Sequence, residues 1–319
     1  MTTPYCYLQK RIVPLEEAKV NVMTHAFLYG TAVFEGVRGN WSEEREQVLL
    51  FRAREHFDRL KKSARIMHIE LPQSSDELVD ITAQVVARAG GREDFYIRPI
   101  AYKSGQVIGP RLSGVESDFM VFAIPYGNYL DPDKGLRCQT STWRRVPDTS
   151  IPARAKVNGL YVNSALAVTE AVENGYDEAI MLNDDGHVSE GSGENIVMIR
   201  DGRLITPEVS DNVLEGITLQ SVFTLAKEEL GLEMQSRTID RSELYIADEI
   251  FLTGTAAHLS AVTEVDRRAV GEGAVGPITR KLQGLFFEAI RGRNPKYTDW
   301  VHGVTPLAEP VAAGANATA

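Results

Sequence analysis

Cysteine is scarce in this sequence, and the residue spacings that bind metals are missing. Among its 319 residues only Cys6 and Cys138 carry thiols, and they lie far apart. The six histidines form no His-x-x-x-His pair. The sequence therefore predicts neither a disulfide scaffold nor a metal site, and its few cysteines are typical of a protein from a reducing cytoplasm.

Long apolar runs, a signal peptide and blocks of like charge are missing as well. No stretch approaches the length of a membrane span, and the N-terminus lacks a charged segment followed by an apolar one. The net charge is −10, with acidic and basic residues mixed along the chain. These features argue against membranes and nucleic acids as partners, so we expect small-molecule partners and a cytoplasmic location.

The length and the hydrophobic pattern predict two domains of mixed α/β structure. A chain of 319 residues exceeds the size of one ordinary core. Strand-like runs alternate with amphipathic helical patterns over 54–68 and 76–89. The periodic pattern is lost around Pro132. We predict a small N-terminal α/β domain over 1–126, a linker over 127–136, a larger C-terminal domain over 137–305 and a disordered tail over 306–319.

The stretch Ser189–Asn195, with the sequence SEGSGEN, puts two carboxylates into a predicted turn between two apolar strands. Gly191 and Gly193 are expected to form the turn, which brings Glu194 to the edge of a sheet. Two interpretations are open from this stretch alone. Both glutamates face solvent, or one of them points into a cofactor pocket.

Lys156 lies in an irregular segment, with Arg154 two residues before it and no acidic residue between Asp148 and Glu170. A surface lysine is the ordinary interpretation. A poorly solvated lysine near positive charge instead has a lowered pKa, which supplies the free amine that a Schiff base requires.

Charged side chains also occur where the pattern predicts buried strands. A strand over 94–102 would place Tyr96 and Arg98 on one face, and a phenol beside a guanidinium fork is typical of a carboxylate site. The stretch His25–Gly39 carries Glu35 and Arg38 among glycines and aromatic residues. A core strand alone explains the aromatic residues but not both charges.

Two turns of small residues are suited to binding an anion through backbone N–H groups. Gly216 precedes a helix predicted over 218–230, and Gly254–Ala257 follows a predicted strand. Pyridoxal phosphate requires this combination of groups. Its aldehyde needs a lysine amine, its ring nitrogen an acid, and its phosphate N–H donors and an arginine.

Six blocks of the sequence resemble the signatures of branched-chain amino acid aminotransferases, which are pyridoxal-phosphate enzymes of fold type IV. The blocks are Tyr29–Arg38, Tyr96–Pro99, Lys156, Ser189–Asn195, Leu214–Thr218 and Thr253–Ala257. They occur in the family's order and at its spacings, and the likeness extends to about Val304. The resemblance implies two α/β domains with the cofactor in the cleft between them. It also implies a homodimer in which the partner subunit completes each substrate pocket.

The resemblance further implies the roles of individual residues toward pyridoxal 5'-phosphate and substrate. Lys156 would form the Schiff base and transfer the proton, Glu194 would bind the pyridine nitrogen, and Tyr161 the phenolic oxygen. Arg59 and the backbone of Ile217, Thr218 and Thr255 would hold the phosphate. The substrate would meet Tyr96, Arg98, Thr255, Ala256, Arg38, Tyr29, Phe34, Gly36 and Tyr129.

The implied reaction is transamination between L-leucine, L-isoleucine or L-valine and 2-oxoglutarate. The sequence departs from the family at two places, and the first of them leaves the substrate range open. The loop Lys103–Leu112 carries Lys103 and Arg111, and His258 stands where the family commonly has a glutamate. The alternatives are a D-amino acid or (R)-amine transaminase of the same fold, a fold-type IV lyase such as aminodeoxychorismate lyase, and a cofactor-free binding protein.

Overall fold

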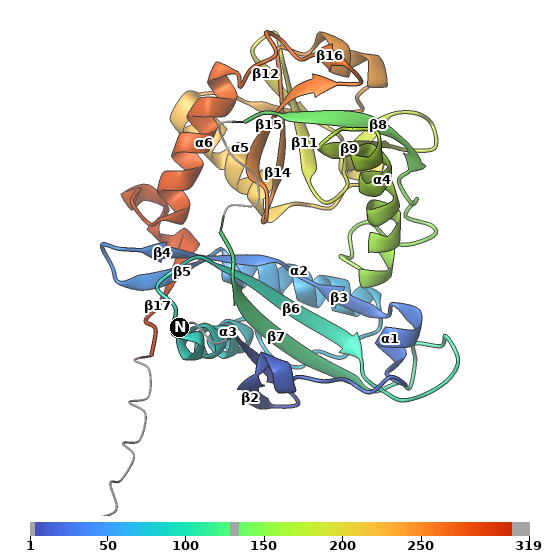
Figure 1. Cartoon of the computed structure of the whole chain (residues 1–319), viewed down its shortest axis with the longest axis vertical. Coiled ribbons are helices and arrows are strands. Elements are labelled where there is room, and N and C mark those ends of the chain that lie inside the picture. Colours follow the sequence, from blue (N-terminus) through green and yellow to red (C-terminus); the bar gives the residue numbers. More distant parts are fainter. Residues whose placement is uncertain (1–3, 128–133, 308–319) are drawn as a thin grey trace, which may run out of the picture.

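The computed structural model describes residues 4–127 and 134–307, which form two β-sheets that are each covered by helices (Figure 1). Most elements of one layer are coloured blue to blue-green, and most elements of the other are coloured green to orange. This arrangement confirms the predicted α/β fold. Within the described ranges, no helix has the length and apolar character needed to cross a membrane. Tyr129 and most of the predicted tail lie outside the described residues.

The first sheet is antiparallel and has eight strands in the order β17-β5-β4-β6-β7-β1-β2, with β3 paired to β6. Its strands are β1 (Tyr5–Leu8), β2 (Arg11–Pro14), β3 (Ala32–Phe34), β4 (Val37–Ser42), β5 (Gln47–Phe51), β6 (Phe95–Lys103), β7 (Ser117–Pro125) and β17 (Val301–Val304). Its helices are α1 (His25–Tyr29), α2 (Ala53–Ile66) and α3 (Ser75–Ala89).

Helices α2 and α3 form as their sequence periodicity predicts. Phe57 and Leu60 of α2 and Leu78 of α3 are fully buried in one core with the β6 residues Phe95 and Ile97. Ser74 caps α3 in a reciprocal capping box, so the first turn satisfies its own backbone donors. One apolar stripe from each helix therefore fixes this pair against the first sheet.

The second sheet is mixed and has nine strands in the order β10-β9-β8-β15-β14-β11-β12-β13, with β16 paired to β15. Its strands are β8 (Leu136–Arg144), β9 (Glu178–Leu182), β10 (Val188–Gly191), β11 (Asn195–Arg200), β12 (Arg203–Thr206), β13 (Met234–Ser236), β14 (Glu249–Gly254), β15 (His258–Val265) and β16 (Arg268–Ala269). The helices are α4 (Tyr161–Glu173), α5 (Ile217–Leu230) and α6 (Pro277–Ile290). Short 3-10 segments lie at Leu15–Glu17, Asn158–Leu160, Val209–Asp211, Arg241–Ile246 and Pro295–Trp300.

Strand β11 is apolar at successive positions because both faces of the second sheet are covered. Ile196 and Met198 lie in one core, whereas Val197 and Ile199 lie in another core with residues of α5 and α6. This alternation follows from the two-residue repeat of a strand.

The last strand within residues 134–307 lies in the first sheet. Strand β17 pairs with β5 and is the red strand beside the blue ones in Figure 1. We predicted the C-terminal domain to run through residue 305, and the pairing of Val301–Val304 places this strand in the other layer. Short, partly exposed edge strands carry little sequence information about their partners, which explains the discrepancy.

A segment of the second half of the chain is held by the first sheet, and it contains Lys156. The backbone N–H of Phe34 donates to the Lys156 carbonyl at 3.0 Å, and Val33 forms an isolated bridge with Val157. The Lys156 N–H donates to Ser63 Oγ of α2 at 3.3 Å. This docking places Lys156 between the two layers.

Candidate active site

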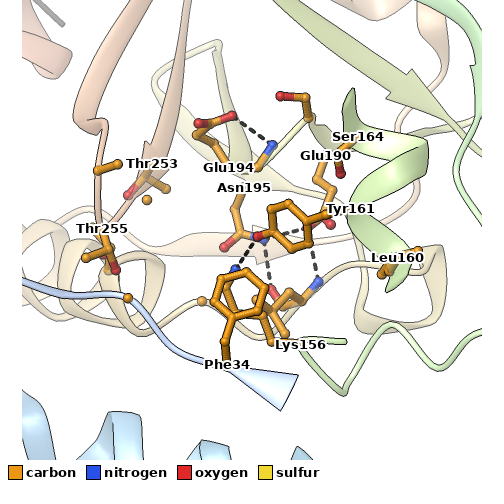
Figure 2. A pocket seen from close by; sticks show the side chains of 18 of the residues that line it. Phe34, Lys156, Leu160, Tyr161, Ser164, Glu190, Glu194, Asn195, Thr253 and Thr255 are labelled. Atoms are coloured by element: carbon orange, nitrogen blue, oxygen red, sulfur yellow. Dashed lines mark hydrogen bonds between the residues drawn. The ribbon is translucent and has the colours of Figure 1, made fainter. Parts of the chain in front are cut away.

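A cavity of about 450 Å³ lies between the two sheets and collects side chains from both. Figure 2 shows ten of its residues by name. Twelve of the residues predicted for the site line it: Phe34, Gly36, Arg59, Tyr96, Arg98, Lys156, Tyr161, Glu194, Ile217, Thr218, Thr255 and Ala256. A volume of this size is typical of a small-molecule site.

Lys156 reaches into the cavity and contacts Tyr161. Its Nζ donates to the Tyr161 hydroxyl at 2.7 Å, as Figure 2 shows, and lies 5.1 Å from the centroid of the Phe34 ring. Arg154, which we expected beside the lysine, instead pairs with Asp148 at 3.6 Å and is half exposed. The amine is therefore placed by two aromatic rings and one hydroxyl.

The segment around Glu194 differs from the glycine-rich turn that we predicted. Residues 189–191 belong to β10, so the turn is confined to 192–194. Neither Gly191 nor Gly193 has a positive φ. A Cβ at Gly191 would lie 3.0 Å from Glu194 Oε2, so glycine leaves room for this carboxylate. The Gly193 N–H donates to the same oxygen at 3.1 Å, which orients the carboxylate in the cavity.

Glu178, another carboxylate that lines the cavity, affects the protonation of Glu194. Burial, and then the charge of Glu178, raise the pKa of Glu194 to about 8. Burial also raises the pKa of Glu178 itself, although Glu178 accepts a 2.6 Å hydrogen bond from the Ala179 N–H. Near neutral pH, Glu194 in the protein without ligand therefore holds a proton that it can donate to a basic nitrogen.

This raised pKa predicts how the stability of the cofactor-free protein depends on pH. The folded protein binds more protons than the unfolded chain between pH 4.5, the value of an unperturbed glutamate, and about 8. The free energy of unfolding should therefore fall as the pH rises through this window. Urea unfolding at several pH values would measure the slope, and Glu194→Gln should flatten it. An equal slope in that variant would contradict the prediction.

Glu190 has a structural environment, in contrast to Glu194. It forms a buried ion pair with Arg145 at 2.6 Å. Its Oε2 accepts from Asn195 Nδ2 at 3.1 Å and from the Leu214 N–H at 3.0 Å. Glu190 therefore joins β10, β11 and the loop before α5, and its charge is already balanced.

One end of the cavity is suited to a phosphate. The N-terminal turn of α5 begins after Gly216. No larger residue fits at this position, because a Cβ would lie 2.0 Å from Asn195 Oδ1. Thr218 and Thr255 line this end together with Arg59. The buried Thr253 Oγ1 has no hydrogen-bond partner within the described ranges. Unpaired donors at a helix start, a cation and a free hydroxyl fit a phosphorylated cofactor.

The cavity also carries the predicted carboxylate clamp. Arg98 Nη2 donates to the Tyr96 hydroxyl at 2.8 Å, and the guanidinium lies 4.3 Å from the centroid of the Phe34 ring. Gly36 must lack a side chain, because a Cβ would lie 2.6 Å from that hydroxyl. The pair faces the cavity as the strand alternation predicts.

Two predicted substrate residues lie outside the cavity of this chain. Arg38 is buried, donates to the Gly127 carbonyl and lies 3.8 Å from Asp94, so it anchors the start of the linker. The hydroxyl of Tyr29 accepts from the Gly109 N–H at 2.9 Å. For both residues, the local sequence does not indicate the long-range partner that holds the side chain.

The two departures from the family also have definite positions. Lys103 is buried and donates to the Val115 carbonyl and to Ser117 Oγ, so it fixes its own loop and does not add a cation to the cavity. Arg111 is exposed. His258 is buried at a φ of 53°, and burial lowers its pKa to about 3, which keeps it neutral.

Sequence reasoning missed two charged residues of the cavity, Arg145 and Glu178. Glu178 opens a strand that is otherwise apolar, and a charge within such a run is a usable signal. Arg145 follows another arginine in an irregular segment and gives no comparable signal. Arg145 is recognised only through its ion pair with Glu190, which is distant in sequence.

Known proteins resemble this chain in sequence and in fold. Residues 32–265 match the family Amino-transferase class IV. A probable branched-chain-amino-acid aminotransferase of Aquifex aeolicus (strain VF5) is 50% identical over 297 residues, which cover 93% of this chain and 96% of that protein. The branched-chain aminotransferase from Thermoproteus uzoniensis, determined with norvaline, has a TM-score of 0.90 at 41% identity and covers 94% of this chain and 99% of its own. The branched-chain amino acid aminotransferase from Thermobaculum terrenum, determined in its PLP-bound holo-form, has a TM-score of 0.91 at 37% identity, with 95% of this chain and 99% of its own covered.

Proposed function

This chain belongs to the class IV aminotransferases and, within them, to the branched-chain amino acid aminotransferases, and from this premise we propose that it transaminates branched-chain L-amino acids with 2-oxoglutarate. The cofactor of the reaction is pyridoxal 5'-phosphate. The observation that carries the proposal is one cavity that holds the Lys156 amine, the Glu194 carboxyl with its raised pKa and the phosphate-binding end around Arg59.

Each end of the cavity would hold one part of the cofactor. Arg59 and the N–H groups of Ile217, Thr218 and Thr255 would bind the phosphate, Glu194 the ring nitrogen and Tyr161 the phenolic oxygen. When bound, pyridoxal phosphate supplies the electron sink that stabilises a carbanion. The Thermobaculum terrenum relative, whose structure was determined in the PLP form, supports this cofactor.

The protein's own groups would move and hold the protons of the reaction. The Lys156 amine would accept the α-proton of the substrate and donate it to the C4′ carbon of the cofactor. Tyr161, 2.7 Å from Nζ, would orient the amine between the two transfers. Glu194 would give its proton to the ring nitrogen and remain beside it as a carboxylate.

The substrate end would accept two side chains of different polarity. The Tyr96 hydroxyl and the N–H groups of Thr255 and Ala256 would bind the α-carboxylate, and Arg98 the distal carboxylate of glutamate. Phe34 lies against the Arg98 guanidinium and offers an apolar surface to a branched aliphatic chain. One face of the cavity would then bind the side chains of both the branched-chain amino acid and glutamate.

A substrate panel tests this function against its alternatives. Initial rates would be measured with L-leucine, D-alanine and (R)-1-phenylethylamine, each with 2-oxoglutarate. We expect turnover of L-leucine. Absence of L-leucine turnover together with D-alanine or (R)-amine turnover would favour the D-amino acid or (R)-amine alternative. Release of pyruvate from aminodeoxychorismate would identify the lyase instead.

We further propose that the protein acts as a homodimer through an apolar patch made of Val22, Phe27 and Ile108. These side chains are 72%, 70% and 73% exposed. Contacts of His25 and Tyr29 with Gly109 join α1 to the loop that carries Ile108. Since Tyr29 lies at this patch and outside the cavity of its own chain, a second copy would bring substrate-facing residues to the site.

Ile108→Asp should separate the dimer and lower activity together. A charge in an apolar interface opposes association because it must be desolvated. Light scattering after size exclusion would give the mass, and the leucine assay the activity. Ile246→Asp is the matched control, since Ile246 is 59% exposed elsewhere on the molecule. A dimeric, fully active Ile108→Asp protein would contradict the proposed interface.

The cytoplasm is the proposed location of the enzyme. Cys6 and Cys138 are both free thiols, as expected in a reducing compartment.

A further inference from the structure

A buried ionic cluster lies behind the phosphate end of the cavity and consists of Glu35, His56 and Arg59. The Glu35 side chain is fully buried and that of His56 is 2% exposed. His56 Nδ1 and Glu35 Oε2 are 2.8 Å apart. Glu35 does not line the cavity, so it has no direct contact with a ligand there. A buried carboxylate with this many partners needs an explanation beyond packing.

Glu35 determines the orientation of the Arg59 guanidinium. Arg59 Nε donates to Glu35 Oε1 and Nη2 donates to Oε2, each at 2.7 Å, which is a bidentate pair. The third nitrogen, Nη1, donates to the Glu215 carbonyl at 2.7 Å, directly before the α5 N-terminus. The fork is therefore fixed at two nitrogens, and its remaining edge is directed to the start of α5.

The charges of the cluster agree with this geometry. Burial alone would raise the pKa of Glu35, but the charge and hydrogen bonds of Arg59 and His56 lower it to about 2. Burial lowers the pKa of His56, so the imidazole is neutral at neutral pH and donates to the carboxylate. Glu35 and Arg59 thus form one ion pair with His56 as an additional donor.

The same short segment also holds Lys156. Phe34, the residue before Glu35, donates its N–H to the Lys156 carbonyl at 3.0 Å, and the Glu35 N–H donates to the Pro99 carbonyl at 2.9 Å. Ser63, one turn after Arg59 on α2, accepts from the Lys156 N–H. Residues 34–35 therefore link the Lys156 backbone to the Arg59 guanidinium.

We propose that Glu35 is a positioning residue for the cofactor, which through its bidentate contact with Arg59 and the Phe34 contact with Lys156 holds the phosphate-binding arginine at a fixed distance from the lysine. This inference rests on the proposed role of Arg59 as a phosphate ligand. Glu35 touches neither cofactor nor substrate in this arrangement.

Binding of pyridoxal phosphate and of pyridoxal, which lacks the phosphate, tests the proposal. Both dissociation constants would be measured on the full-length protein after removal and return of the cofactor. Glu35→Gln should weaken pyridoxal phosphate binding about 10- to 100-fold, the range seen when a residue that orients a metal ligand is lost, and should leave pyridoxal binding unchanged. Lack of pyridoxal phosphate binding by the unmodified protein would instead contradict the proposed function.

Two other results would overturn the positioning role. If Glu35 acted only through its negative charge, Glu35→Gln would strengthen phosphate binding, because the Arg59 charge would no longer be neutralised. If Glu35 only supported the fold, both ligands would bind more weakly to the same degree. Circular dichroism of each variant would verify that the protein is folded.

Two more variants keep the test decisive. Glu35→Asp retains the charge, but its side chain is shorter by one methylene, so this variant should also lose part of the preference for the phosphorylated ligand. It replaces Glu35→Gln in the test if Glu35→Gln does not fold. In an Arg59→Lys background, Glu35→Gln should cause no further loss of that preference, since there is no fork left to orient. An undiminished further loss would show that Glu35 acts independently of Arg59.

Discussion

Lys156→Ala should lower the kcat of transamination by about 10⁴-fold or more and abolish the visible absorption band of the lysine-bound cofactor. The substitution removes both the amine that forms the Schiff base and the group that transfers the α-proton. No other lysine or histidine lines the cavity among the described residues. Absorption spectra of the reconstituted protein and steady-state rates with L-leucine would measure the two effects.

Lys227→Ala provides the control for this experiment. Lys227 lies on the exposed face of α5, the helix whose N-terminus faces the cavity, so its removal alters the same element without reaching the site. Its spectrum and rate should equal those of the unmodified protein. A band that survives in Lys156→Ala would refute the assignment of the lysine.

The sequence was sufficient for those site residues whose position follows from a local repeat. Tyr96 and Arg98 share a face because strand residues alternate, and the alternation of burial holds from Phe95 to Ile100 in β6. Gly216 precedes a helix because glycine and small residues mark helix starts, and α5 begins at the next residue. Local steric rules act over a few residues, so they can be read without the fold.

Partners that are distant in sequence could not be predicted. Arg38 was expected in the substrate pocket because it stands in the same motif as Phe34, but Asp94 and Gly127 hold it outside. Arg59 was placed at the phosphate by resemblance alone, and the carboxylate that orients it, Glu35, was noted without a partner. Such pairs depend on how sheets and helices pack, which a single sequence does not encode in any local pattern.

Substitution by alanine should mainly slow the chemistry at Glu194 and mainly destabilise the fold at Glu190, although only four positions separate the two residues. Glu194→Ala should slow α-proton abstraction about 10²- to 10³-fold, because it removes the acid that keeps the ring nitrogen protonated while the carbanion forms. The rate of cofactor bleaching in single turnovers with L-leucine measures this step. The fold should tolerate the change above neutral pH, since a buried carboxylate with a pKa raised to about 8 opposes folding there.

Glu190→Ala should instead destabilise the protein and affect the chemistry less. It leaves Arg145 buried without its 2.6 Å partner and frees the Leu214 N–H, and breaking a buried ion pair typically costs about 3–5 kcal/mol. Urea unfolding would measure the loss, and single turnovers at low temperature would measure the proton abstraction that remains in the folded fraction. Glu190 anchors the loop that leads to α5. Its loss should therefore weaken phosphate binding more than it slows proton transfer. If Glu190→Ala slowed proton abstraction more than Glu194→Ala, the two assignments would have to be exchanged.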